Sequence, residues 1–181
     1  MAQRNLLPFI LLGLIEQSPK TGYDLKKEFE TEIGEFWSVK HSQIYSELKR
    51  LVASEQIVSE TGYFGNKIEK TYYKITNKGK ETLETWKYSY DKQLVVNKDE
   101  FVLKLYFIKD KNDPRLKDLL NEQLLLHKNK LNHLNERMKK LFSDTKEIDD
   151  NYGHYLILDH AIRRENEYAS WLEEAIGFLA K

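Results

Sequence analysis

The chain has 181 residues, enough for one large domain or two small ones, and we expect two. Charged residues make up 32% and hydrophobic residues 40% of the sequence, which excludes wholesale disorder. There is no cysteine, which excludes disulfides, thiol nucleophiles and thiolate metal sites, and the formal net charge is +0, so any nucleic-acid surface has to be local.

The first predicted element is a helix over residues 5–17, apolar on almost all sides, which we expect at the centre of a domain core. This apolar run is too short to cross a membrane and has no signal-peptide cleavage site. Together with the absence of cysteine, it predicts a cytoplasmic protein without membrane contact. Thr21 then predicts the cap of a second helix over residues 22–33, which Gly34 ends.

The third predicted helix, residues 41–54, has one apolar and one polar face. Its buried stripe is expected to consist of Ile44, Leu48, Leu51 and Val52. β-Branched and aromatic residues on both sides of Gly65-Asn66 then predict a β-hairpin with strands over 57–64 and 68–75 and a basic tip. Three helices followed by a hairpin predict a winged helix-turn-helix domain, to which we assign residues 1–90.

The second half, residues 91–181, is expected to be helical. A helix from about residue 76 leads into it, a short and mostly buried helix is predicted over 98–109, and a long helix starts with Pro114 in its first turn. Heptad columns then run through Leu120, His127, Leu134 and Leu141 beside Leu124, Leu131 and Met138, and, after a polar break at 143–153, through Tyr155, Ile162, Ala169 and Ile176 beside Leu158, Glu165, Leu172 and Leu179.

Two long helices with narrow apolar seams need partners. An antiparallel pair buries part of each seam, and a second copy of the chain would bury the rest, so this half is predicted to be a homodimerisation domain. At their heptad positions, His127 and Glu165 are expected to be hydrogen-bonded core residues that set the register. The fold class is therefore mainly α with a small β-hairpin.

The polar face of the third helix is the main candidate for function. Residues 40–80 contain eight Lys or Arg against four Glu, which is a local positive excess. Side chains that reach base edges and phosphates are concentrated on this helix and close to it, namely Tyr23, Ser38, Lys40, Ser42, Gln43, Tyr45, Ser46 and Lys49, with Lys67 and Lys70 on the hairpin. A merely solvated helix face is the alternative, which the basic hairpin directly after the helix disfavours.

Several stretches resemble a known family. "GEFWSVKHSQIYSELKRL", with "GYDL" before it and "KTYYKITNKGKETLETW" after it, resembles the PadR family of winged-helix transcriptional regulators. "KDEFVLKLYFI" and "YGHYLILDHAIRRENEYASWLE" are similar to the C-terminal domain of the members that repress phenolic acid decarboxylase. The resemblance implies a homodimeric repressor on a palindromic operator, released by a hydroxycinnamic acid such as p-coumaric or ferulic acid. Related branches leave a hydrophobic drug, another small molecule or a protein open as the effector.

A hydroxycinnamate site needs an apolar slot, a donor or cation for the carboxylate, and a phenol partner. With the family in view, Glu100 is the expected phenol acceptor, Phe101 the ring wall, and His154 and Tyr155 the carboxylate donors, while His41 would couple the effector to DNA. Lys104 and Leu158 complete the candidate set. The open alternative is that Glu100 and Lys104 form only a surface ion pair.

Enzymatic chemistry is not expected. The sequence has no nucleophile elbow, phosphate-binding glycine loop or dinucleotide fingerprint. The five histidines are dispersed and no "HExxH" occurs, so we assign no metal and no cofactor.

Overall fold

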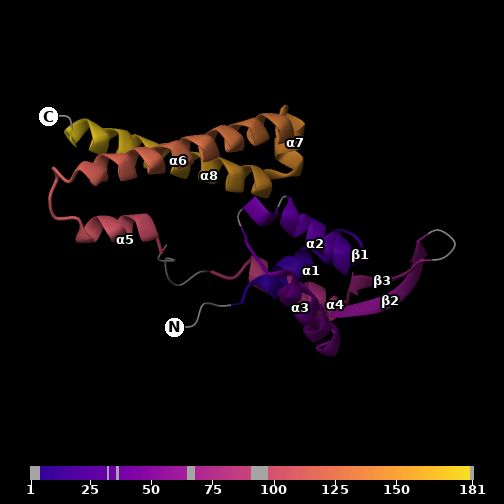
Figure 1. Cartoon of the computed structure of the whole chain (residues 1–181). Helices are drawn as coiled ribbons and strands as arrows, with labels where there is room; N and C mark the ends of the chain where they lie inside the picture. The colour runs from indigo at the N-terminus through magenta and orange to yellow at the C-terminus, as the bar shows by residue number, and fades with distance from the viewer. Residues whose placement is uncertain (1–4, 32, 36, 65–67, 91–97, 180–181) are drawn as a thin grey trace. The chain divides into compact units, whose positions relative to one another are not determined.

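The computed structural model describes residues 5–31, 33–35, 37–64, 68–90 and 98–179. The chain divides into two compact units, Met1–Val95 and Val96–Lys181, and each is described by itself. The predicted boundary after residue 90 stays a prediction, because the segment that follows it lies outside the described residues. Figure 1 shows the elements of both units.

The first unit contains four helices, a 3-10 turn and a small sheet in its described residues. In chain order these are α1 Leu7–Gln17, β1 Lys20–Thr21, α2 Gly22–Glu30, η1 Ile33–Glu35, α3 His41–Ala53, β2 Ile57–Phe64, β3 Ile68–Ile75 and α4 Asn77–Lys87. Helix α1 contacts α3, α4 and β3, and Leu11 and Leu12 are completely buried in it. It is the core helix that its all-round apolar pattern predicts.

The start of α2 follows the predicted cap. The Asp24 amide N–H donates to Thr21 Oγ1 at 3.1 Å, and the Thr21 N–H donates to Asp24 Oδ2 at 2.9 Å, which together form a capping box. The end of this helix was predicted wrongly, because α2 stops at Glu30. Gly34 lies in the 3-10 turn η1, where a side chain would not fit, since a Cβ there would lie 2.2 Å from the Phe29 carbonyl oxygen.

The sheet has three antiparallel strands in the order β1-β3-β2. The hairpin strands β2 and β3 have the predicted bounds, with Ile57 opposite Ile75 and Phe64 opposite Ile68. The two-residue strand β1, which pairs Lys20 with Tyr73, was not predicted. The hairpin tip, including Lys67, lies outside the described residues.

The second unit is helical in its described residues, with α5 Glu100–Phe107, α6 Pro114–Leu141, α7 Thr145–Asp150 and α8 Tyr152–Leu179. Helices α6 and α8 run antiparallel, side by side (Figure 1). Contacts that fix this register include the pair of His127 with Glu165 and the pair of Phe142 with Tyr155. Leu120, Leu134, Leu158 and Leu172 are buried along the seam, as the heptads predict.

Two expectations for this unit were wrong. Helix α5 was expected to be mostly buried, yet none of its residues is, and Tyr106 and Phe107 are 71% and 69% exposed. One side of α5 contacts α8, where Phe101 meets Trp171 with ring centroids 6.4 Å apart, and its other side has no cover within the described unit.

The second expectation concerns the predicted polar break, which contains the short helix α7. Asp144 caps this helix by accepting from the Glu147 N–H at 2.9 Å.

Candidate DNA interface and effector sites

Helix α3 separates its apolar and polar side chains as predicted. Ile44 and Leu48 are completely buried and Leu51 nearly so, which anchors the helix to α1 and α2. Val52, the fourth residue of the predicted stripe, is only half-buried. The polar members of the candidate set on this helix are all exposed: Ser42, Gln43, Tyr45, Ser46 and Lys49. Ser38 and Lys40, just before the helix, are exposed as well. The polar surface that α3 offers is therefore available to a partner.

One member of this face also has a structural role. Gln43 Oε1 accepts a hydrogen bond from the Lys40 backbone N–H at 2.9 Å and so caps the start of α3. The Gln43 carbonyl oxygen is thereby engaged, and its amide NH₂ group is the donor left for a partner.

Glu47, on the same helix, was not predicted to be buried. Only 6% of the residue is exposed, and its Oε2 accepts from Asn5 Nδ2 at 3.2 Å and from Arg50 Nη1 at 3.1 Å. A buried carboxylate is tolerated when it is paired in this way. The i,i+3 spacing of Glu47 and Arg50 could have predicted their ion pair from the sequence, whereas the contact with Asn5 is formed only by the fold.

The strand β3 brings Lys70 close to the start of α2. Burial raises the pKa of the Asp24 carboxyl, but the hydrogen bonds from Thr21 and the positive charges of Lys70 and Lys20 outweigh it and lower that pKa below its usual value. Tyr23, in the first turn of α2, is 66% exposed. The start of α2 thus gathers an aromatic side chain and positive charge beside the helix α3.

In the second unit, a groove of about 740 Å³ brings three of the predicted effector residues together, namely Glu100, Phe101 and Lys104. Its other lining residues are Lys98, Asp99, Gln123, His127, Arg164, Glu165 and Tyr168. Lys104 Nζ lies 2.8 Å from Glu100 Oε1, and this hydrogen bond and charge lower the pKa of Glu100. The ion pair that was the alternative for these two residues is therefore present, and both side chains are exposed.

The floor of this groove is a connected polar cluster. His127 Nδ1 lies 2.5 Å from Glu165 Oε2, and the His127 ring stacks on Tyr168 with centroids 3.8 Å apart. The Tyr168 hydroxyl donates to Asp99 Oδ2 at 2.7 Å, a contact that joins the start of α5 to α8. His127 and Glu165 are thus the hydrogen-bonded core residues that their heptad positions predict.

Charges within the cluster shift its pKa values. Burial raises the pKa of Glu165, but hydrogen bonds from Arg164 and His127 outweigh this and leave that pKa below its usual value. Burial and the hydrogen bond to Asp99 raise the pKa of the Tyr168 hydroxyl. Glu165 is therefore held ionised and Tyr168 neutral at pH 7.

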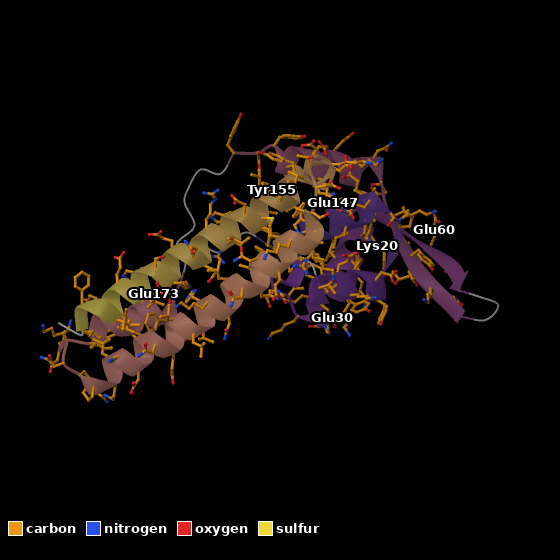
Figure 2. The ribbon with its side chains drawn as sticks, turned by 90° about the horizontal axis from the view of Figure 1, so that it is seen from above. Lys20, Glu30, Glu60, Glu147, Tyr155 and Glu173 are labelled. Atoms are coloured by element: carbon orange, nitrogen blue, oxygen red, sulfur yellow. The ribbon has the colours of Figure 1, made fainter. Side chains whose placement is uncertain are left out.

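His154 and Tyr155 lie near the start of α8, away from the groove. Figure 2 shows Tyr155 and Glu173 toward opposite ends of this helix. At a rise of about 1.5 Å per residue, His154 and Glu165 are roughly 16 Å apart along the axis. One small aromatic acid therefore does not contact both the groove and the side chains of His154 and Tyr155 in a single chain.

The start of α8 forms an aromatic cluster of its own. The rings of His154 and Tyr155 pack edge-on against Phe142 at 5.5 Å and 5.6 Å, and both side chains are half-buried. Within the described part of the chain, neither His154 nor Tyr155 has a hydrogen-bond partner for its side chain. Leu158 is buried in the seam at 4% exposure, which makes it a core residue of the unit.

The remaining effector candidate, His41, belongs to the first unit. It is the first residue of α3, and its Nε2 lies 3.3 Å from Glu30 Oε1 at the end of α2, with both side chains about half exposed.

The described residues contain no group of three or more His, Asp or Glu that could hold a metal ion. Within the same ranges, no helix combines the length and apolar character needed to span a bilayer.

Comparisons with known proteins agree over the whole chain. The model of the "Transcriptional regulator PadR-like family" matches residues 11–85, and that of "Virulence activator alpha C-term" matches residues 97–180. The negative transcriptional regulator PadR of Bacillus subtilis is 37% identical over 180 residues, which cover 98% of this chain and 99% of that protein.

Solved structures give the same result. The crystal structure of Bacillus subtilis PadR in complex with operator DNA superposes with a TM-score of 0.85 at 38% identity and covers 98% of this chain and 99% of its own. The complex of that protein with p-coumaric acid has a TM-score of 0.86 at 36% identity, over 98% and 100% of the two chains. The Vibrio cholerae virulence activator AphA, at 23% identity and a TM-score of 0.72 over 96% and 98%, shares the fold. With a relative this similar over its full length, the chain belongs to the PadR family of transcriptional regulators.

Proposed function

We propose that this protein is a sequence-specific DNA-binding repressor that occupies a palindromic operator as a homodimer and leaves it when a hydroxycinnamic acid binds. One observation carries the proposal: the near full-length identity of 37% to a negative regulator whose crystal structures contain operator DNA and p-coumaric acid. The gene under its control then encodes an enzyme that removes such acids, a phenolic acid decarboxylase. A protein that acts on the chromosome in this way belongs in the cytoplasm and needs no catalytic activity.

DNA recognition follows from the surface of α3. Gln43 and Tyr45 are hydrogen-bonding side chains of the size that reads base edges in a major groove, and both are exposed. Lys40 and Lys49 are placed before and within the same helix to meet phosphates. The basic residues of the hairpin, Lys67 and Lys70, would then meet the flanking backbone, as the wing of such a domain does.

The exposed apolar side chains of the second unit support a homodimer. Besides Tyr106 and Phe107 on α5, Leu125 and Leu126 on α6 are 60% and 61% exposed, and Trp171 on α8 is 40% exposed. An exposed apolar surface of this kind is typical of an oligomer interface. A two-fold dimer places its two recognition helices one DNA turn, about 34 Å, apart and therefore reads a palindrome.

For the effector we favour the aromatic cluster at the start of α8. The carboxylate of a hydroxycinnamate needs a donor, and the side chains of His154 and Tyr155 are half-buried without a hydrogen-bond partner in the described chain. Phe142 offers a ring edge beside both. In the groove, by contrast, Glu100 is already paired with Lys104. Glu100, Phe101 and Lys104 remain the second candidate set.

The energy that induction needs is modest. To weaken operator binding a thousandfold, the acid must bind the free dimer more tightly than the DNA-bound dimer, by about 4 kcal/mol of binding free energy in total. Two sites in a dimer share this, at about 2 kcal/mol each. One charge-assisted hydrogen bond together with the burial of an aromatic ring is of that size.

The proposal is tested by two measurements on the wild-type chain. Selection from a pool of random duplexes should enrich a palindromic sequence, hereafter the selected operator. A thermal-shift series should show a rise in melting temperature with p-coumarate and ferulate and none with a set of hydrophobic cationic drugs, because a ligand that binds the folded state stabilises it. Enrichment of no duplex, or stabilisation by the drugs alone, would contradict the proposal.

A further inference from the structure

Gly22 lies directly beneath the side chain of Tyr45, one of the candidate DNA-contacting residues. It is the first residue of α2 and is buried. A Cβ atom built on Gly22 would lie 2.5 Å from Cε1 of Tyr45, with Cζ at 3.2 Å and Cδ1 at 3.3 Å. Real Cβ contacts are not that short, so the ring of Tyr45 rests on the α-carbon of Gly22 and leaves no room for a side chain there.

The backbone gives no other reason for a glycine at this position. Gly22 follows the cap residue Thr21, and its φ is outside the left-handed region that favours glycine. Any L-residue adopts such a conformation in the first turn of a helix, and alanine would lower the conformational entropy of the unfolded chain. The close contact with Tyr45 is therefore the reason that position 22 needs a glycine.

Tyr45 is held on one side and open on the other. Its residue is 45% exposed, although it belongs to the polar face of α3. Tyr45 also lies near Tyr73 on β3: burial raises the pKa of the Tyr73 hydroxyl, and the neighbouring Tyr45 phenol raises it further. A ring fixed by Gly22 and close to the sheet has a defined direction before DNA arrives, and such preorganisation favours binding.

We propose that Gly22 is a positioning residue for operator recognition. Because it has no side chain, the ring of Tyr45 can pack on its α-carbon, and this contact holds the ring in the orientation that contacts DNA. This inference rests on the proposed DNA-binding function and names a residue that acts through another. A methyl group at position 22 would displace the outer atoms of a half-exposed ring. Such a side chain moves at little cost to the fold, so the loss falls on DNA binding and not on stability.

The first measurement compares Gly22→Ala with wild type for affinity to the selected operator and for melting temperature. We expect binding to weaken roughly tenfold or more, as for the loss of one recognition contact in each half-site. The melting temperature should be unchanged or slightly higher. Gly13→Ala is the matched control, because Gly13 is also helical and a Cβ there meets no atom within 4 Å, so its operator affinity should equal that of wild type.

The second measurement repeats Gly22→Ala in a Tyr45→Ala background. If Gly22 acts through the ring, the added methyl group has nothing to displace, and affinity should change by less than about twofold. The inference is overturned if Gly22→Ala binds like wild type, if it loses as much affinity in the Tyr45→Ala background, or if it lowers the melting temperature well below that of Gly13→Ala. A wild-type chain that enriches no operator would instead contradict the DNA-binding function itself.

Discussion

Replacing one or both members of the His127–Glu165 pair measures how far this polar contact holds α6 to α8. The Glu165 side chain is 8% exposed and the His127 side chain 17%, and the contact is 2.5 Å long. Removing one partner of a buried pair generally costs about 3–5 kcal/mol, because the other is left unpaired. Glu165 keeps a bond to Arg164, whose side chain is 54% exposed. For His127→Leu we therefore expect a smaller loss, about 2 kcal/mol.

The two remaining variants complete the cycle. Glu165→Leu leaves His127 with a hydrogen bond to Gln123 and its stacking on Tyr168, and should also cost about 2–3 kcal/mol. The double variant places two apolar side chains in an apolar seam, so its loss should be under about 1 kcal/mol, or absent. Urea denaturation at one fixed protein concentration gives all three free energies of unfolding. A double variant that loses the sum of the two single losses would refute the reasoning, because the two residues would then be uncoupled.

Three other predictions concern DNA, effector and pH. Lys70→Ala should weaken binding to all duplexes and reduce the slope of log affinity against log salt by about two, because the dimer loses one phosphate contact in each half-site. Gln43→Ala should instead relax sequence preference. Filter binding at several salt concentrations separates the two variants, and equal behaviour would contradict this division. His154→Ala should hold the selected operator normally but need at least tenfold more p-coumarate for release, while Glu100→Ala responds normally; the reverse result would place the acid in the groove. The pKa of Glu165 in the fold lies below its usual 4.5, so ionised Glu165 stabilises the protein above about pH 4.5, and this stability is lost as pH falls through the lower folded pKa. The melting temperature of Glu165→Gln should therefore fall less steeply with decreasing pH than that of wild type.

Local patterns predicted the parts of the fold that local interactions determine. The strands on both sides of Gly65-Asn66 have the predicted bounds because alternation and turn chemistry set the register of a hairpin. Burial of Ile44, Leu48 and Leu51 on α3 followed from helical periodicity alone. Thr21 was a correct cap because the capping box is contained within four residues.

Features that depend on distant contacts were not predictable in the same way. The strand β1 exists only because β3, some fifty positions later, offers it a partner. The burial of Glu47 depends on Asn5, and the docking of α5 depends on the bond from Tyr168 to Asp99 across 69 positions. An apolar helix such as α5 has the same periodicity whether its own chain or a second copy covers it. This is why its exposure was mispredicted.

The effector residues show the same limit. Glu100 and Lys104 were correctly seen as neighbours from their i,i+4 spacing. Their distance from His154 depends on where α5 docks along α8, which no short-range pattern specifies. The resemblance to the family supplied the class of effector, and residue chemistry supplied the candidates. Only the packing of α5, α6 and α8 separated the candidates of the second unit into two groups.

The most direct test of the account is a titration of the selected operator, fluorescently labelled, followed by anisotropy at fixed salt concentration. Wild-type protein should bind as a dimer of two 21.6 kDa chains, and p-coumarate added to the complex should release the DNA, with benzoate as the control acid that lacks the phenol and the propenoate arm. We predict at least a hundredfold loss of operator affinity at saturating p-coumarate and little loss with benzoate. An operator complex that is unaffected by p-coumarate and ferulate would contradict the central claim.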